Sequence, residues 1–327
     1  MSVLETLLDA NVHCHAEYRG GLANHLPMAL VALHRLGATD ARLQAFAAAY
    51  GAKLEPAPPA VDWPPAQPWK AWLGDPSAWP AYRALFAQWL VHEGRDGVLP
   101  QVLPALLPGC GAAAFHGLIR TAYAVESGHT GELADGLAYW ACRFLPLPEE
   151  AGERGREDDP GVVIDALRAA MQPWRSDAGL IVERMQAAAQ HPAFASHIAR
   201  LRVGDETLAA LARLALARYA QCGDFTVLHL ATASHAMRAL LPFVDEPLPA
   251  LRSFWVACAA AAASVRERPM PAPLAAPLPG WPEIVARAIA SDDEHVHKLV
   301  HTSRAQEAAY GWDECRAAAA RAVATAL

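Results

Sequence analysis

The chain has 327 residues, of which 54% are hydrophobic and 19% are charged, and this balance excludes an intrinsically disordered protein. The formal net charge of −7 argues against a nucleic-acid partner, because such proteins carry a basic face. A chain of this length can bury a large core without disulfide bonds, and its six cysteines are dispersed with no CxxC pair. Only three of the 27 basic residues are lysines, namely Lys53, Lys70 and Lys298.

The N-terminus and the most apolar stretch bear on localisation. Glu5 and Asp9 lie where a secretory signal would carry a basic region followed by an apolar run, so no signal peptide is predicted. Residues 254–265 form the most apolar stretch, and about a dozen residues are too few to span a bilayer. We therefore expect a cytoplasmic protein with reduced thiols that does not contact a membrane.

Hydrophobic residues recur at helical spacing in almost every periodic segment, and alternating β-branched stretches are absent. The first predicted helix lies within residues 21–36, with Asn24 as its N-cap and Pro27 in its first turn. Gly37 ends this helix, and Asp40 begins the next one. Further helices are predicted over residues 79–93, 97–107, 112–126, 129–144, 161–171, 178–190, 205–220, 225–241, 248–264, 281–290, 293–310 and 312–326. The sequence therefore predicts an all-α fold, a large irregular helical bundle or array without a substantial sheet.

Three segments interrupt this helical pattern. Residues 55–68 and 268–280 are rich in proline, whereas residues 146–160 are charged and contain both Pro and Gly. We expect residues 146–160 to form a mobile loop. Each segment is a candidate domain boundary, but the preferred interpretation is a single helical domain over residues 1–327 with long connections.

Common catalytic and cofactor signatures are missing. The sequence contains no P-loop, GxSxG or HExxH pattern. Residues 109–114 superficially match a GxGxxA dinucleotide fingerprint, but the preceding segment contains three prolines and does not have the pattern of a strand. We interpret residues 109–114 as a helix N-terminus, and the chain therefore shows no NADPH-binding motif.

Histidine is the informative excess, with 14 residues in the chain. Four segments place imidazoles among apolar helical residues, where each ring must find hydrogen-bond partners. A shared metal ion satisfies several such rings at once, whereas the alternative for each ring is a hydrogen-bonded histidine in the core. The metal-ligand candidates are His25, His116, His229, His235 and His295. The others lie near termini, in loops or on mixed faces, and are His13, His15, His34, His92, His129, His191, His197, His297 and His301.

Lys298 is the second unusual residue. It follows His295 by three positions, so both lie on one face of a predicted helix. Burial lowers the pKa of an amine and makes it nucleophilic, so Lys298 could react with carbon dioxide to give a carbamate, an anionic oxygen ligand for a metal. The alternative is an ammonium that reaches water or the acidic residues 292–294. Lys53 and Lys70 are expected to be exposed.

Five segments, in order along the chain, carry a resemblance to a known family. They are NHLPMALVALHRLGA (24–38), FHGLIRTAYAVESG (115–128), ELADGLAYWA (132–141), DFTVLHLATASHAMRALLP (224–242) and DDEHVHKLVHT (292–302). Together they resemble the questin oxidase-like family. The resemblance implies an all-helical oxygenase of aromatic polyketides, in a family implicated in the oxidative opening of anthraquinone rings.

The resemblance also implies a non-haem iron held by four histidines and a carboxylated lysine. The matching residues here are His25, His116, His229, His295 and Lys298. His235 lies six residues after His229 and could replace it. Contacts to the metal ligands or to the substrate are expected from Arg120, Tyr123, Glu126 and His235. The chain is short for the family, so the iron ligands carry over better than the identity of the substrate.

These implications lead to a mechanistic hypothesis. Five ligands leave one open position on an octahedral iron, so an electron-rich hydroxyaromatic would supply the first electrons to dioxygen. Oxygen would then be inserted beside a ring carbonyl, in a Baeyer–Villiger-type ring opening. The expected partners are a small aromatic substrate and dioxygen, and the sequence leaves open whether NADPH or a reductase supplies further electrons. An aromatic pocket or ordinary packing would explain Trp63, Trp69, Trp72, Trp79 and Trp89.

Two other functions remain open from the sequence. A zinc or manganese hydrolase could use the same scaffold and a carbamylated lysine, although such sites use several carboxylates. A helical binding protein without a metal would place His25, His116 and His229 far apart, each with a conventional hydrogen-bonded role.

Overall fold

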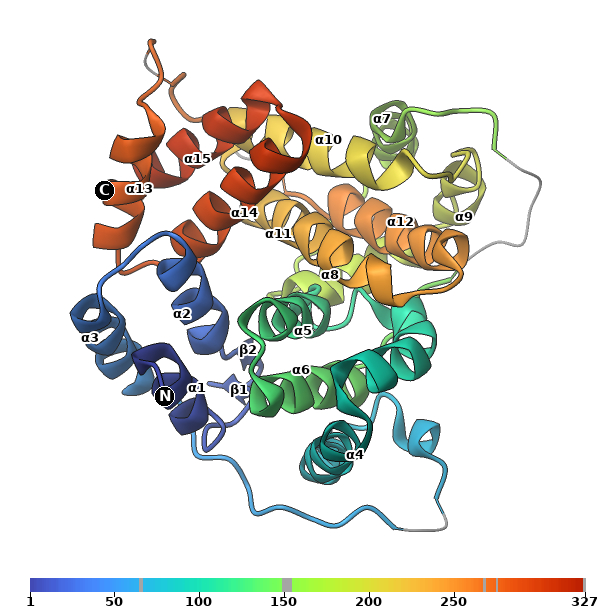
Figure 1. Cartoon of the computed structure of the whole chain (residues 1–327). Coiled ribbons are helices and arrows are strands. Elements are labelled where there is room, and N and C mark those ends of the chain that lie inside the picture. Colours follow the sequence, from blue (N-terminus) through green and yellow to red (C-terminus); the bar gives the residue numbers. More distant parts are fainter. Residues whose placement is uncertain (65–66, 149–154, 267–268, 275, 326–327) are drawn as a thin grey trace.

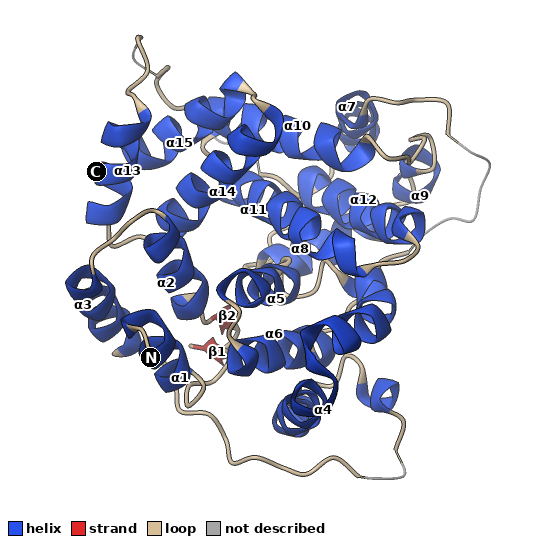
Figure 2. Cartoon of the chain, in the orientation of Figure 1, coloured by secondary structure: helices blue, strands red, loops and turns tan. Residues whose placement is uncertain are grey.

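Helices account for nearly all regular structure in the computed structural model, which describes residues 1–64, 67–148, 155–266, 269–274 and 276–325. Within these residues the only sheet is an antiparallel hairpin of β1 (Glu17–Tyr18) and β2 (Leu22–Ala23), shown in red in Figure 2. The prediction of an all-α fold without a substantial sheet is therefore confirmed.

The N-terminal region contains α1 (Val3–Asn11), α2 (Leu26–Arg35) and α3 (Asp40–Gly51). Helix α1 is absent from the prediction, although Ser2 and Glu5 form a capping box around its first turn. Asn24 was predicted as the N-cap of α2, and the N-cap is instead His25. Asn24 still caps this helix end, because its Oδ1 accepts from the Leu26 N–H at 3.0 Å.

The middle of the chain forms α4 (Trp79–Leu106), α5 (His116–Ser127) and α6 (Thr130–Cys142). Gly94 interrupts α4 with a φ of 68°, which explains why the sequence pattern predicts two helices there. The remaining α-helices are α7 (Pro160–Met171), α8 (Ile181–Ala189), α9 (Phe194–Ile198), α10 (Thr207–Cys222), α11 (Phe225–Leu240), α12 (Pro247–Ala263), α13 (Trp281–Ala290), α14 (Glu294–Tyr310) and α15 (Asp313–Thr325). Short 3-10 helices occupy Trp69–Trp72, Pro76–Ala78, Leu107–Gly109 and Leu241–Phe243.

The predicted mobile loop falls partly on residues that the structure leaves out. Residues 149–154 lie outside the described residues, whereas 146–148 and 155–159 carry no helix. The prediction for residues 146–160 therefore stays a prediction.

Four helices form a closed ring at the centre of the molecule. Helix α2 packs against α5, α5 against α11, α11 against α14, and α14 against α2, and they lie around the middle of the view in Figure 1. Helix α5 is buried on all sides over residues 116–124, as expected of a central helix. Helix α6 covers the outside of α5, and α4 packs against α6. Helices α10 and α12 pack against α11, and α15 packs against α14.

The buried core joins both ends of the chain. Hydrophobic residues from Leu4 in α1 to Val323 in α15 belong to one contiguous cluster. The six cysteines are free thiols. None of the helices in the described ranges has both the length and the apolar character needed to cross a membrane.

Candidate metal centre

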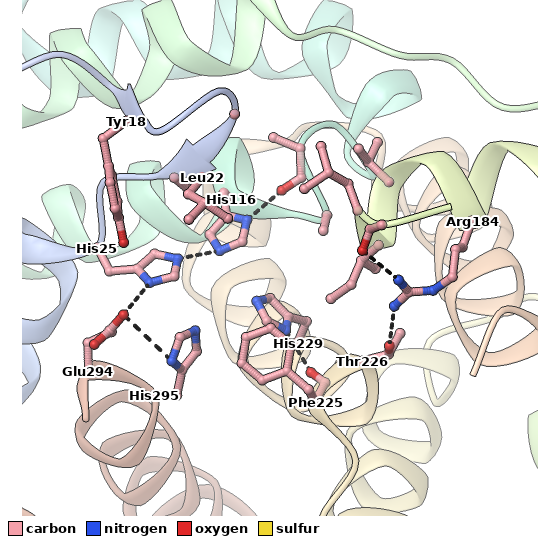
Figure 3. A pocket seen from close by; sticks show the side chains of 18 of the residues that line it. Tyr18, Leu22, His25, His116, Arg184, Phe225, Thr226, His229, Glu294 and His295 are labelled. Atoms are coloured by element: carbon pink, nitrogen blue, oxygen red, sulfur yellow. Dashed lines mark hydrogen bonds and ion pairs between the residues drawn. The ribbon is translucent and has the colours of Figure 1, made fainter. Parts of the chain in front are cut away.

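Each helix of the central ring brings one histidine to a common point. His25 is the N-cap residue of α2, His116 begins α5, His229 lies one turn into α11, and His295 lies in the first turn of α14. Ring centroids are 4.6 Å apart for His25 and His116 and 4.9 Å apart for His116 and His229. The His295 ring lies 4.7 Å from His25 and 5.7 Å from His229. Figure 3 shows the four rings facing a shared space.

On each of these rings the Nδ1 atom faces a protein oxygen. The pairs are His25 with Glu294 Oε1 at 3.3 Å, His116 with the Ala113 carbonyl at 2.5 Å, His229 with the Phe225 carbonyl at 2.7 Å, and His295 with Asp293 Oδ1 at 3.1 Å. Because these oxygens accept hydrogen bonds, each neutral ring carries its proton on Nδ1. The four Nε2 atoms are left with lone pairs, the tautomer that metal-bound histidines adopt.

The Nε2 atoms lack protein partners of the right chemistry. His229 Nε2 and His295 Nε2 are buried without a hydrogen-bond partner among the described residues. His25 Nε2 and His116 Nε2 lie only 2.6 Å apart. Two lone pairs at that separation repel each other unless a cation accepts both. The donor set therefore fits a metal ion.

Burial keeps these imidazoles neutral. It lowers the pKa of His116 to about 3, with a further contribution from the charge of Lys298. The pKa values of His25 and His229 are also well below the usual value for histidine, again chiefly because of burial. Burial and the charge of Lys298 also lower the pKa of His295. Neutral rings need no deprotonation before they can bind a metal.

Lys298 lies one turn after His295 on α14 and is fully buried, at 0% exposure. Its Nζ atom has no hydrogen-bond partner in the part of the chain that the structure describes, so it does not reach water or an acidic neighbour. Burial lowers the pKa of Lys298 to about 8, although nearby carboxylates act in the opposite direction. Lys70 is exposed as expected, whereas Lys53 is half-buried with its Nζ 3.7 Å from the centroid of Tyr50.

A cavity of about 400 Å³ opens onto the four imidazoles. Leu22 and Phe225 line it although they are 44% and 45% exposed, which is unusual for large hydrophobic side chains. The Phe225 ring lies 4.6 Å from His295 and 4.7 Å from His229, between centroids (Figure 3). Arg184 lines the same cavity and donates to the Thr226 hydroxyl. The site is thus an apolar cavity with a nitrogen-rich wall.

The five tryptophans for which the sequence allowed an aromatic pocket do not line this cavity. Trp63, Trp69, Trp72 and Trp89 pack with Tyr82 and Phe86 beside α4, and Trp79 packs against His15. Ordinary packing therefore accounts for these side chains.

The four residues predicted to contact the ligands or the substrate lie outside the cavity lining. Arg120 is buried in ion pairs with Glu132 and Asp135 of α6, at 2.9 and 3.1 Å. Tyr123 touches the site indirectly, because its hydroxyl donates to the Lys298 carbonyl at 3.4 Å. Glu126 and His235 lie in a separate group of side chains that does not line the cavity. The structure thus places His229, and not His235, beside His116.

Sequence reasoning did not identify three residues of this region as site residues. Glu294 accepts from His25 Nδ1, and Phe225 packs on two imidazoles. His301 was grouped with the ordinary histidines but is buried beside Glu126. One signal was available, because His301 follows Lys298 by three residues and therefore shares its helix face. The contacts of Glu294 and Phe225 join different helices, and a sequence pattern carries no such signal.

One of two comparisons with known proteins finds a match. A search of curated proteins finds no match to the chain. The model of the questin oxidase-like family matches residues 22–303, which include all four imidazoles and Lys298. Membership of this family implies an oxidoreductase of the oxidase or oxygenase type. By this match, the chain belongs to the questin oxidase-like family.

Proposed function

We propose that the chain is a non-haem iron-dependent oxygenase that inserts dioxygen-derived oxygen into a hydroxyaromatic or quinone substrate, with Baeyer–Villiger-type ring opening. The observation that carries this proposal is the convergence of His25, His116, His229 and His295 beside the buried amine of Lys298. A helical binding protein would not gather four neutral imidazoles whose Nε2 atoms either lack a partner or face one another. A bimetallic hydrolase would need more carboxylates than the nearby Asp293 and Glu294, whose side chains already hold imidazoles.

Lys298 would supply the fifth ligand after carboxylation. Its neutral amine would attack carbon dioxide, a C–N bond would form, and a proton would be lost to give an anionic carbamate. Burial favours this reaction because it raises the fraction of neutral amine, and the carbamate would neutralise part of the metal charge. Four Nε2 atoms and one carbamate oxygen would then hold the iron. When bound, iron would supply the redox chemistry that activates dioxygen for transfer to the ring.

The cavity suits an aromatic substrate. The exposed faces of Leu22 and Phe225 would be covered by a flat ring, which removes apolar surface from water. Arg184 and Arg266 line the cavity and offer positive charge to a phenolate or quinone oxygen. These side chains would orient the ring against the imidazole wall and exclude water from it.

The direct test is the metal content of the Lys298→Met variant. Methionine fills similar space without an amine, so the fold should persist while the carbamate is lost. We expect about one iron per wild-type chain after anaerobic loading, and at least a tenfold loss of iron affinity in the variant. Wild-type protein loaded in ¹³C-bicarbonate should also show a carbamate carbon resonance that Lys298→Met lacks.

Lys70→Met is the matched control, because Lys70 is exposed and lies far along the chain from the imidazoles. It should retain wild-type iron content. If Lys298→Met binds iron as tightly as wild type, the carbamate proposal is wrong. If the wild-type chain binds no iron, the oxygenase proposal is wrong.

A further inference from the structure

A second group of metal-ligand side chains lies further along three of the helices that build the imidazole centre. Glu126 is in the last turn of α5, His235 is in the middle of α11, and His301 is in the middle of α14. Each histidine follows an imidazole of the first centre by six residues, which corresponds to about 9 Å along a helix. The second group is therefore distinct from the cavity and from its four imidazoles.

The three side chains converge. One ligand atom from each lies within 4.8 Å of the other two. His235 and His301 are 3% and 8% exposed, and the Glu126 side chain is 18% exposed. Two imidazoles and one carboxylate form a common donor set for divalent transition metals, with further positions open for water.

Glu126 and His235 are in direct contact. His235 Nε2 lies 2.6 Å from Glu126 Oε1, and the Arg238 guanidinium donates to His235 Nδ1 at 3.4 Å, so the neutral ring carries its proton on Nε2. A metal ion would replace this proton and be shared by the carboxylate and the imidazole.

His301 directs its second ring nitrogen at the same carboxylate. Its Nδ1 lies 3.3 Å from the Tyr123 hydroxyl, and its Nε2 lies 3.6 Å from Glu126 Oε2. A separation of 3.6 Å is longer than a hydrogen bond, and it leaves room for a cation or a water molecule held by both atoms.

We propose that Glu126, His235 and His301 form a second site that binds a divalent transition-metal cation, with zinc as the preferred ion. Three arginines surround the group, and their positive charges weaken its affinity for a cation. Arg35 and Arg304 are exposed, so solvent screens their charge, and Arg238 is half-buried, with its guanidinium also held by the Ala305 carbonyl.

A metal bound to His235 Nε2 moves the ring proton to Nδ1. The 3.4 Å contact between the Arg238 guanidinium and His235 Nδ1 would therefore have to open when the metal binds. This site is therefore weaker than the four-imidazole centre, and it favours zinc over iron(II) in the Irving–Williams order.

The experiment is zinc binding to the full-length chain. Equilibrium dialysis of wild-type protein should reach about two zinc equivalents, one at each site, and crystals soaked in zinc should show anomalous density between Glu126, His235 and His301 at the zinc edge. Glu126→Gln and His301→Gln should each retain the tighter equivalent and bind the weaker one at least tenfold less well. His34→Gln, at an exposed position on α2, is the control and should bind both equivalents.

The retained equivalent at the four imidazoles shows that a variant is folded. The proposal is overturned if wild-type protein binds a single zinc, or if zinc-edge density is absent from the second group. Unchanged binding of two equivalents by Glu126→Gln would also overturn it. A variant that loses both equivalents is misfolded, and the anomalous map of the wild-type crystal then decides alone.

Discussion

At the scale of single residues, the centre depends on what each imidazole does with its other nitrogen. Backbone carbonyls hold His116 and His229, whereas carboxylates hold His25 and His295. An anionic acceptor makes the opposite nitrogen a stronger donor to a metal. The four rings are therefore fixed in orientation, and two of them gain basicity from Glu294 and Asp293.

Glu294→Gln tests this arrangement at one residue. The substitution keeps the size of the side chain but removes the negative charge beside His25 Nδ1. We expect metal affinity to fall about 10- to 100-fold, measured by competition with a chelator. Glu283→Gln is the matched control, because Glu283 is exposed and pairs with Arg287 at the surface of α13. Equal affinities for the two variants would show that Glu294 does not support the centre.

The residue types of the site could be predicted, but their pairing could not. His116 and Lys298 were identified because a polar group among apolar helical neighbours must have a compensating partner. His235 satisfied the same criterion and lies in a different cluster, because a period of 3.6 residues gives the face of a helix but not what that face meets. Arg120 forms ion pairs with Glu132 and Asp135 of the following helix, α6, and these contacts hold it away from the cavity.

At the scale of elements, the segment before α5 is the least regular part of the site. Ala113, Ala114 and Phe115 have φ values of 47°, 56° and 69°, so three consecutive L-residues are left-handed. Each costs about 1–2 kcal/mol relative to a right-handed conformation. This turn brings the Ala113 carbonyl to His116 Nδ1. Residues 109–114 were interpreted as a helix N-terminus, and the helix in fact begins at His116 because of this turn.

Ala113→Gly tests whether the turn stores strain. Glycine adopts positive φ without a steric cost, so the free energy of unfolding should rise by up to about 1 kcal/mol in urea denaturation of the metal-free chain. Ala308→Gly, at an exposed position within α14, should instead lower it by about 1 kcal/mol. Equal losses in both variants would mean that the turn carries no strain.

Helices were the most predictable elements, because each has a long apolar stripe. The short α9 and the hairpin of β1 and β2 were not predicted, since a few residues carry too little periodicity to stand out. The hairpin depends on a turn in which Arg19, Gly20 and Gly21 all have positive φ. Leu22, which lines the cavity, is positioned by that hairpin.

At the scale of the whole molecule, buried neutral histidines make the metal-free chain sensitive to acid. The folded pKa of His116 is about 3, and those of His297 and His301 are about 4, because burial penalises the charged ring. In the unfolded chain these groups titrate near 6.5, so between about pH 6.5 and 4 the unfolded state binds more protons. The stability present above pH 6.5 is therefore lost progressively as the pH falls through this window.

We expect each such histidine to remove up to about 1.4 kcal/mol of stability per pH unit below 6.5. Thermal unfolding of metal-free protein at a series of pH values measures this loss. Metal-loaded protein is the comparison, and its melting temperature should lie above that of the metal-free chain at pH 7. A melting temperature that stays constant between pH 7 and pH 5 in the metal-free chain would contradict the interpretation.

The helical ring also has an electrostatic consequence. Helices α2, α5, α11 and α14 all present their N-terminal ends to the four imidazoles. Each N-terminus carries the positive pole of a helix macrodipole, equivalent to about half an elementary charge. Together these poles oppose protonation of the rings and attract anions. The architecture that gathers four uncharged imidazoles therefore also creates a positive field, in which a carbamate on Lys298 and an ionised phenol would both be stabilised.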